Sequence, residues 1–143
     1  MDDAELFIKR AVYLAQRSPF KRFKSGAVIT KRGVILAEGW SHIGPSLREL
    51  YSVHSEIHSL GRARHLDLSG STAYVATISK KSGNITLAKP CITCAIAMAS
   101  AGVELAYYTV NNDEWDYINL DDDIDTLDLY RASPSKGRQI IVA

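Results

Sequence analysis

The sequence lacks the features of a membrane or secreted protein. No apolar run among its 143 residues approaches the length of about 18 residues that a membrane-spanning helix requires. The N-terminus reads Met1-Asp2-Asp3, whereas a secretory signal begins with a positively charged segment. We therefore expect a cytoplasmic protein that has no membrane partner.

Linkers, repeats and low-complexity segments are also missing, so nothing in the sequence divides the chain into parts. The chain is long enough to bury a substantial core without disulfides. Its hydrophobic fraction of 46% and charged fraction of 23% are ordinary for a globular protein. We expect residues 1–143 to form a single domain.

A large excess of charge of one sign is absent as well. The net charge is +1, with a balance of +4 in residues 1–72 and of −3 in residues 73–143. The segment 111–128 contains eight acidic residues and no basic one. A basic face large enough to follow a nucleic-acid backbone is therefore not obvious.

One short segment, residues 19–24, departs from this balance because three cations are interleaved with two aromatic residues. Such a segment can hold phosphates and stack on bases. We favour the simpler interpretation, a solvated loop in which the rings of Phe20 and Phe23 turn into the core.

Apolar spacing along the chain alternates between the periods of helices and strands. In chain order, it predicts a helix over 4–17, a β-hairpin of 27–30 and 34–37, a helix over 54–65, a strand over 72–79, a helix over 91–101, a strand over 103–110 and a short helix within 113–120. Beyond these we expect an acidic segment at 121–130 and an edge strand or tail at 139–142. This order predicts an α/β sandwich with helices on the faces of a mixed sheet.

Cysteine is scarce, and both cysteines lie in the segment Pro90-Cys91-Ile92-Thr93-Cys94. Upstream of it stands His54-Ser55-Glu56. His54, Cys91 and Cys94 together offer three ligands for a tetrahedral zinc ion and leave its fourth position open, which is typical of a catalytic site. Each segment is expected at the start of a helix, where the helix dipole favours a thiolate.

Glu56 lies two residues from the proposed histidine ligand and is not needed to bind the metal. A carboxyl group in this place can act as general acid and base for a water molecule that the metal activates. The spelling H-x-E…P-C-x-x-C is the signature of zinc-dependent nucleobase deaminases.

Two other interpretations of these segments stay open. His58 lies one helical turn after His54 and would complete a closed Cys₂His₂ structural site, although Glu56 would then have no role. A redox pair of Cys91 and Cys94 would leave both His54 and Glu56 unexplained.

Residues 26–109 resemble the cytidine/deoxycytidylate deaminase superfamily, in the branch that uses one histidine and two cysteines, and look most like its small deoxycytidylate-type members from phages and bacteria. The likeness rests on these segments: Gly26-Ala27-Val28-Ile29, Gly39-Trp40-Ser41, His54-x-Glu56-Ile57, Leu68 to Val75, Ala88 to Cys94 and Ala101 to Thr109. The resemblance implies a three-layer α/β/α sandwich around a sheet of about five strands. It also implies Zn²⁺ with no organic cofactor, and a homo-oligomer.

The same resemblance implies the contacts with the substrate. The backbone at Ser55 would hold the carbonyl group of the base, and the carbonyls near Lys89 and Pro90 would receive the leaving amine. Ser41 stands where the family commonly has an asparagine that holds the sugar, and Ser55 stands where it usually has alanine.

The leading hypothesis is therefore zinc-dependent deamination of a cytosine nucleotide or nucleoside, with dCMP, converted to dUMP and ammonia, as the first candidate. The alternative is a deaminase that acts on a cytosine or adenine within single-stranded DNA, RNA or tRNA, which needs a positive groove beside the pocket. A third hypothesis is a non-catalytic binding module that zinc stabilises.

Overall fold

The computed structural model describes residues 3–44 and 52–120. The acidic segment and the edge strand or tail expected after residue 120 lie outside the described residues. Among the described residues, no helix is long and apolar enough to span a membrane.

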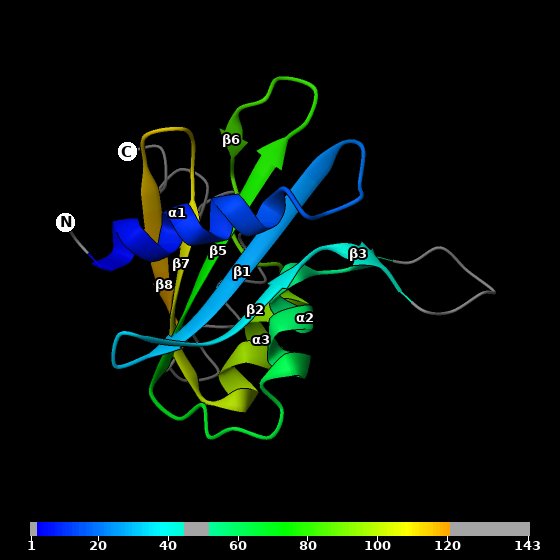
Figure 1. The fold of residues 1–143 in the computed structure, drawn as a ribbon. Helices are drawn as coiled ribbons and strands as arrows, with labels where there is room; N and C mark the ends of the chain where they lie inside the picture. Colours follow the sequence, from blue (N-terminus) through cyan, green and yellow to red (C-terminus); the bar gives the residue numbers. More distant parts are fainter. Residues whose placement is uncertain (1–2, 45–51, 121–143) are drawn as a thin grey trace.

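A mixed sheet forms the centre of the molecule (Figure 1). Its strand order is β2-β1-β5-β7-β8, and a short strand, β6, pairs with the end of β5. Only β5 and β7 are parallel neighbours, and the other pairs are antiparallel. The strands are β1 (Phe23–Lys31), β2 (Val34–Trp40), β5 (Ser71–Ser79), β6 (Ile85–Thr86), β7 (Val103–Thr109) and β8 (Trp115–Asn119), and a separate two-stranded ribbon contains β3 (His42–Ile43) and β4 (Ser52–Val53).

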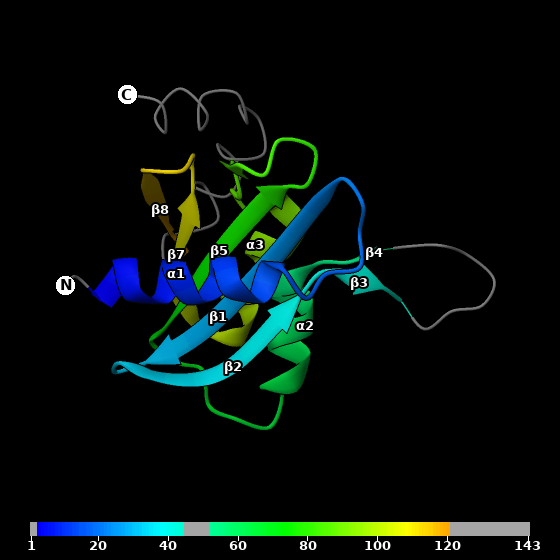
Figure 2. The ribbon, with the colours of Figure 1, turned by 45° about the horizontal axis from the view of Figure 1, so that its top comes forward.

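Helices cover both faces of this sheet, as Figures 1 and 2 show. Helix α1 (Asp3–Ala15) lies on one face, and α2 (Ser55–Arg62) and α3 (Ile92–Ala101) lie on the other. Because side chains alternate between the faces of a strand, Val28 packs with α1, whereas its neighbour Ile29 packs in the cluster that includes α3. The predicted three-layer α/β/α sandwich is confirmed.

The predicted hairpin is confirmed, with longer strands than the apolar runs alone indicate. Lys31 pairs with Val34, so the turn has only two residues, Arg32 and Gly33. Both have positive φ, at 53° and 78°. A two-residue turn of this kind matches the right-handed twist of the strands that it joins.

Gly39 in β2 allows α2 to lie directly on the sheet. A Cβ atom at this position would be 2.5 Å from the Ser59 nitrogen and 2.7 Å from the Ser55 carbonyl oxygen. Any larger residue would push the helix away from the strand. This contact therefore fixes the distance between the sheet and the first turn of α2, where the H-x-E segment lies.

The predicted short helix within 113–120 is wrong, because these residues form β8. Trp115, Tyr117 and Ile118 are residue types that favour strands, and β8 pairs antiparallel with β7. Tyr117 lies opposite Tyr107, and their ring centroids are 5.4 Å apart. Cross-strand aromatic pairs of this kind stabilise a sheet.

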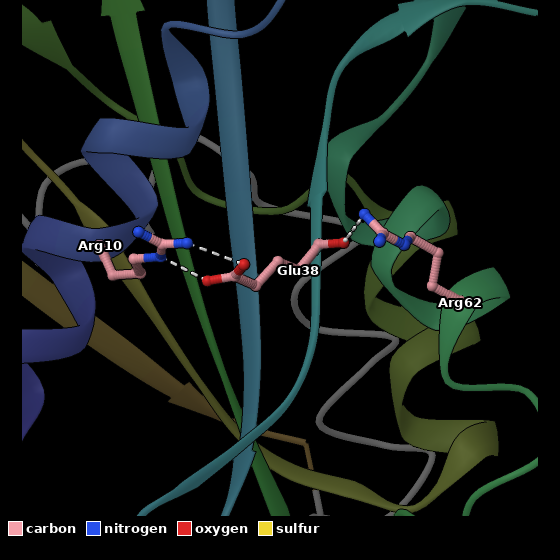
Figure 3. A network of polar contacts seen from close by, with 3 residues as sticks. All are labelled: Arg10, Glu38 and Arg62. Carbon is pink, nitrogen blue, oxygen red and sulfur yellow. Dashed lines mark hydrogen bonds and ion pairs between the residues drawn. The ribbon is translucent and has the colours of Figure 1, made fainter.

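Glu38 of β2 accepts hydrogen bonds from helices on both faces of the sheet (Figure 3). Arg10 of α1 donates two hydrogen bonds to the Glu38 carboxylate, one from Nε and one from Nη2, the latter at 3.0 Å. Arg62 of α2 donates to the main-chain oxygen of Glu38 at 3.3 Å. Because β2 is the last strand in the described order, Arg62 also covers part of an exposed strand edge.

Candidate active site

Two helix N-termini bring the predicted metal ligands together. His54 is the N-cap residue of α2, and Cys91 is the N-cap residue of α3. Cys94 follows in the first turn of α3. The His54 Nδ1 atom lies 3.3 Å from Cys94 Sγ and 3.7 Å from Cys91 Sγ.

This arrangement fits a tetrahedral zinc ion. Bond lengths of about 2.0 Å to nitrogen and about 2.3 Å to sulfur place tetrahedral ligand atoms roughly 3.5 Å apart. The two measured separations lie on either side of this value, and all three ligand atoms lie within 4.8 Å of one another. Among the described residues, these three alone form such a group of potential metal ligands.

His58 does not belong to this group. Its Nδ1 atom accepts a hydrogen bond from the Trp40 backbone N–H at 3.1 Å, and its ring packs edge-on against His42 at 4.5 Å. Burial, together with His42 and Arg62, holds the pKa of His58 below its usual value, which suits a neutral acceptor. Within the described residues, the geometry thus gives no support to a closed Cys₂His₂ site.

The pKa values of the two thiols are shifted in opposite directions. The hydrogen bond with Cys94, assisted by His54, lowers the pKa of Cys91 to about 5. The same hydrogen bond and burial raise the pKa of the Cys94 thiol. The direction of the shift favours the thiolate form of Cys91, which is the form in which a cysteine binds a metal.

Glu56 is buried beside the potential metal ligands, with 5% of its surface exposed. Burial raises the pKa of its carboxyl group, and the hydrogen bond from the Ser55 hydroxyl at 3.1 Å acts in the opposite direction. A carboxyl group with a raised pKa can both accept and return a proton near neutral pH, which is what general acid and base catalysis requires.

These groups open into a pocket of about 320 Å³. The volume lies within the range of small-molecule sites. Serines, apolar side chains, one lysine and the candidate catalytic groups line it: Phe20, Phe23, Ser25, Ser41, His54, Glu56, Val75, Thr77, Leu87, Ala88, Lys89 and Cys91.

The residues predicted to contact substrate are placed in different ways. Ser41 and Lys89 line the pocket, whereas Ser55 and Pro90 are buried and are not part of its lining. The Ser41 hydroxyl already has protein partners, since it accepts from the Ser25 N–H at 3.0 Å and lies 2.8 Å from the Ser18 hydroxyl.

The prediction that Phe20 and Phe23 turn into the core is wrong. Phe23 is 55% exposed, Phe20 is half-buried, and both line the pocket. The reason is the alternation of side chains along β1: Phe23 shares a face with Ser25, which contacts Ser55 of α2, and at the first residue of the strand this face borders the pocket. The interleaving of aromatics with cations in residues 19–24 was the sequence signal for this role. Ser25 and Thr77 also line the pocket, and no sequence motif singled them out.

Residues 1–110 match the family model of the cytidine and deoxycytidylate deaminase zinc-binding region. The match covers more than half of the chain, which therefore belongs to this family, a family of zinc-binding deaminases. His54, Cys91 and Cys94 are of the residue types that bind zinc through nitrogen and sulfur, and they lie close enough together to hold one ion. No curated protein sequence matches the chain.

Solved structures of deaminases share this fold. The dCMP deaminase of cyanophage S-TIM5, in apo form, is 27% identical with a TM-score of 0.61, over 75% of this chain and 82% of that one. A second structure of it, in complex with dCMP and dUMP, is 26% identical with a TM-score of 0.59, over 73% and 78%.

Two other solved structures are similar to this chain, one of them over only part of its own length. RibD from Acinetobacter baumannii is 26% identical with a TM-score of 0.54, over 76% of this chain but only 28% of that one. Cytidine deaminase from Burkholderia pseudomallei has a TM-score of 0.63 over 81% of this chain and 91% of that one. At 15% identity, the latter likeness shows the shared fold alone.

Proposed function

We propose that the protein is a zinc-dependent hydrolase that deaminates a cytosine nucleotide or nucleoside, with dCMP as the leading substrate. The observation that carries this proposal is the meeting of three potential zinc ligands beside a buried carboxyl group, at a pocket that His54, Cys91 and Glu56 line. The likeness to a phage dCMP deaminase, one structure of which contains dCMP and dUMP, supports the choice of substrate.

His54, Cys91 and Cys94 would hold the zinc ion, whose Lewis acidity supplies the activation of water. Glu56 takes a proton from the attacking water and delivers it to the ring nitrogen, and a second proton reaches the departing amine through the same carboxyl group. Addition of water at C4 and loss of ammonia convert cytosine into uracil, so atoms and charge balance.

The other proposed contacts hold the substrate in place. The Ser55 backbone would bind the base carbonyl, the carbonyls of Lys89 and Pro90 would receive the leaving amine, and Ser41 would lie near the sugar. The ring of Phe23, exposed in the pocket, is suited to pack against the base. The family resemblance also leads us to expect a homo-oligomer.

A deaminase acting on single-stranded DNA or on RNA is the second candidate. The observation that favours it is the exposure of Lys21, Arg22 and Phe23 together, with Phe23 at the pocket. Cations beside an exposed ring are typical of surfaces that bind single strands.

Ammonia release from zinc-quantified protein tests both candidates. The substrates are cytosine, deoxycytidine, dCMP, dCTP, adenosine, guanine and a cytosine-bearing single strand. The variants are Glu56→Gln and, as a control, Glu104→Gln, which changes an exposed glutamate on β7 outside the pocket.

We expect turnover of dCMP that Glu56→Gln lowers by at least about a thousandfold while one zinc ion stays bound, since general acid and base catalysis alone contributes about 10²–10⁴-fold. Turnover of the strand alone would replace the first candidate by the second. If none of the substrates releases ammonia while zinc is bound, both candidates would be contradicted, and the non-catalytic module that zinc stabilises would be favoured.

A further inference from the structure

Three side chains form a chain of hydrogen bonds that ends on the carboxylate of Glu56. The Ser25 hydroxyl lies 2.6 Å from the Ser55 hydroxyl, which in turn donates to Glu56 Oε1 at 3.1 Å. Ser55 is fully buried, so no solvent competes for these bonds. We propose that the Ser55 hydroxyl is a positioning group for the Glu56 carboxylate and that Ser25 orients this hydroxyl. This proposal rests on the proposed function.

The direction of the hydrogen bonds follows from the number of protons available. An ionised carboxylate only accepts, and a serine hydroxyl has a single proton to donate. Ser55 gives its proton to Glu56, so its oxygen must accept the proton of Ser25. When Glu56 is ionised, as it is when it acts as a base, the chain therefore has one arrangement, from Ser25 through Ser55 to Glu56.

Ser25 is held by the sheet. It lies in β1, opposite Thr77 of β5, and its backbone exchanges two hydrogen bonds with Ser41: its N–H donates to the Ser41 hydroxyl at 3.0 Å, and its carbonyl accepts from the Ser41 N–H at 2.9 Å. Ser55 and Glu56 belong to the first turn of α2. The hydroxyl chain thus fixes a helix-borne carboxylate relative to the sheet.

Such a fixed point matters because the last torsion angle of a glutamate side chain has a broad, shallow preference. The backbone N–H of Glu56 and the Cys94 side chain also hydrogen-bond to this carboxyl group, and the Ser55 hydroxyl adds the donor on Oε1 that connects it to β1. A general base has to lie within hydrogen-bonding distance of the proton that it takes, and small displacements of catalytic groups cost rate.

The test compares kcat and KM of zinc-loaded Ser55→Ala, Ser25→Ala and the double variant. Ser55→Ala keeps the backbone N–H that is proposed to hold the base, so we expect kcat to fall about tenfold with KM unchanged. That is the size expected for a hydrogen bond to a charged group, at 1.36 kcal/mol for each factor of ten. The double variant should be no slower than Ser55→Ala, because Ser25 acts through Ser55.

Ser59→Ala is the matched control. Ser59 is a buried serine of the same helix, and its hydroxyl donates to the main-chain oxygen of Glu56 at 2.8 Å, not to the carboxylate. We expect its kcat to equal that of the unchanged protein. An equal fall in Ser59→Ala, an unchanged kcat in Ser55→Ala, or a rise in KM alone would overturn the proposal.

Crystal structures of the zinc-loaded protein and of Ser55→Ala supply a second measurement that does not depend on turnover. We expect one carboxylate orientation of Glu56 in the unchanged protein and a rotated or divided carboxylate in the variant. The same single orientation in both would overturn the positioning role. If the unchanged protein releases no ammonia, the proposed function fails, and the crystal structures still decide the role of Ser55.

Discussion

Glu38 joins three elements at the edge of the sheet, and the loss of its charge should lower the stability of the fold measurably. Its carboxylate accepts two hydrogen bonds from Arg10, while Arg62 donates to its main-chain oxygen. Glu38→Gln removes the charge but keeps one acceptor and nearly the same volume. The substitution therefore isolates the electrostatic part of the contact between α1 and β2.

The magnitude follows from the exposure of the pair. The side chains are 39% exposed at Arg10 and 23% exposed at Glu38, so solvent screens much of their attraction. Exposed ion pairs contribute about 0.2–1 kcal/mol to the free energy of unfolding, and bidentate pairs of arginine with a carboxylate lie at the upper end of this range. We expect Glu38→Gln to lower the free energy of unfolding by about 1 kcal/mol, equivalent to roughly 3–4 °C in Tm for a chain of this size.

The pH dependence provides an internal check. The hydrogen bonds from Arg10 lower the pKa of Glu38, burial opposes them, and the charges of Arg10, Arg17 and Arg62 assist them. A carboxyl group whose pKa is lower in the folded state stabilises the fold above its unfolded pKa of about 4.3, and this contribution is lost as the pH falls through the folded value. The difference between the two proteins should therefore be complete at pH 7 and shrink steadily below about pH 4.

Thermal unfolding of both proteins, prepared without zinc because protonated histidine and cysteine release it at acidic pH, is followed by circular dichroism at pH 7 and pH 3.5 and at low and high salt to measure this difference. Glu104→Gln, on the exposed surface of β7, controls for the loss of a carboxylate elsewhere. An unchanged Tm at pH 7 would refute the reasoning. So would a difference that stays the same at acidic pH or in high salt, because an ion pair weakens under both conditions.

Two further predictions concern the pocket. Cys91→Ala should reduce bound zinc from one ion per chain to almost none, whereas His58→Ala should retain the ion because His58 contacts Trp40 rather than the metal ligands; metal analysis after dialysis decides between this and a Cys₂His₂ site. Phe23→Ala should raise KM about three- to tenfold and leave kcat nearly unchanged, since an aromatic contact contributes about 0.5–1.5 kcal/mol to binding. Steady-state kinetics with dCMP measures the second effect, and a fall in kcat with KM unchanged would contradict it.

The metal site was the part of the molecule that local sequence predicts best. Cys91 and Cys94 are three residues apart, so a single helical turn places both near one ion. His54 and Glu56 are likewise close in sequence. Only the proximity of the two segments depends on the tertiary fold. Because histidine and cysteine commonly bind one zinc ion together, their presence indicates that the two segments lie side by side.

Features that depend on long-range packing were harder to predict. Residues 115–119 form a strand because β7 offers an edge to pair with; Trp115, Tyr117 and Ile118 favour a strand, but the partner that decides for it is visible only in the fold. The exposure of Phe20 and Phe23 depends on the pocket that they line, which residues distant in the sequence, such as Leu87 and Cys91, complete. Ser25 reaches Ser55 across 30 positions of sequence, through a hydrogen bond that no local pattern encodes.

The sheet order explains why the site forms at this end of the molecule. Strands β5 and β7 are parallel neighbours, so the chain between them has to cross one face of the sheet, and α3 lies in that connection. Right-handed crossover is the strong preference for such connections, and it selects one face. Helix α2 lies on the same face, held close to β2 at Gly39, which has no side chain to keep it away. Two helix N-termini then meet beside Ser25 of β1, so the positions of the potential metal ligands, the Glu56 carboxylate and the hydroxyls of Ser25 and Ser55 all follow from one arrangement of strands.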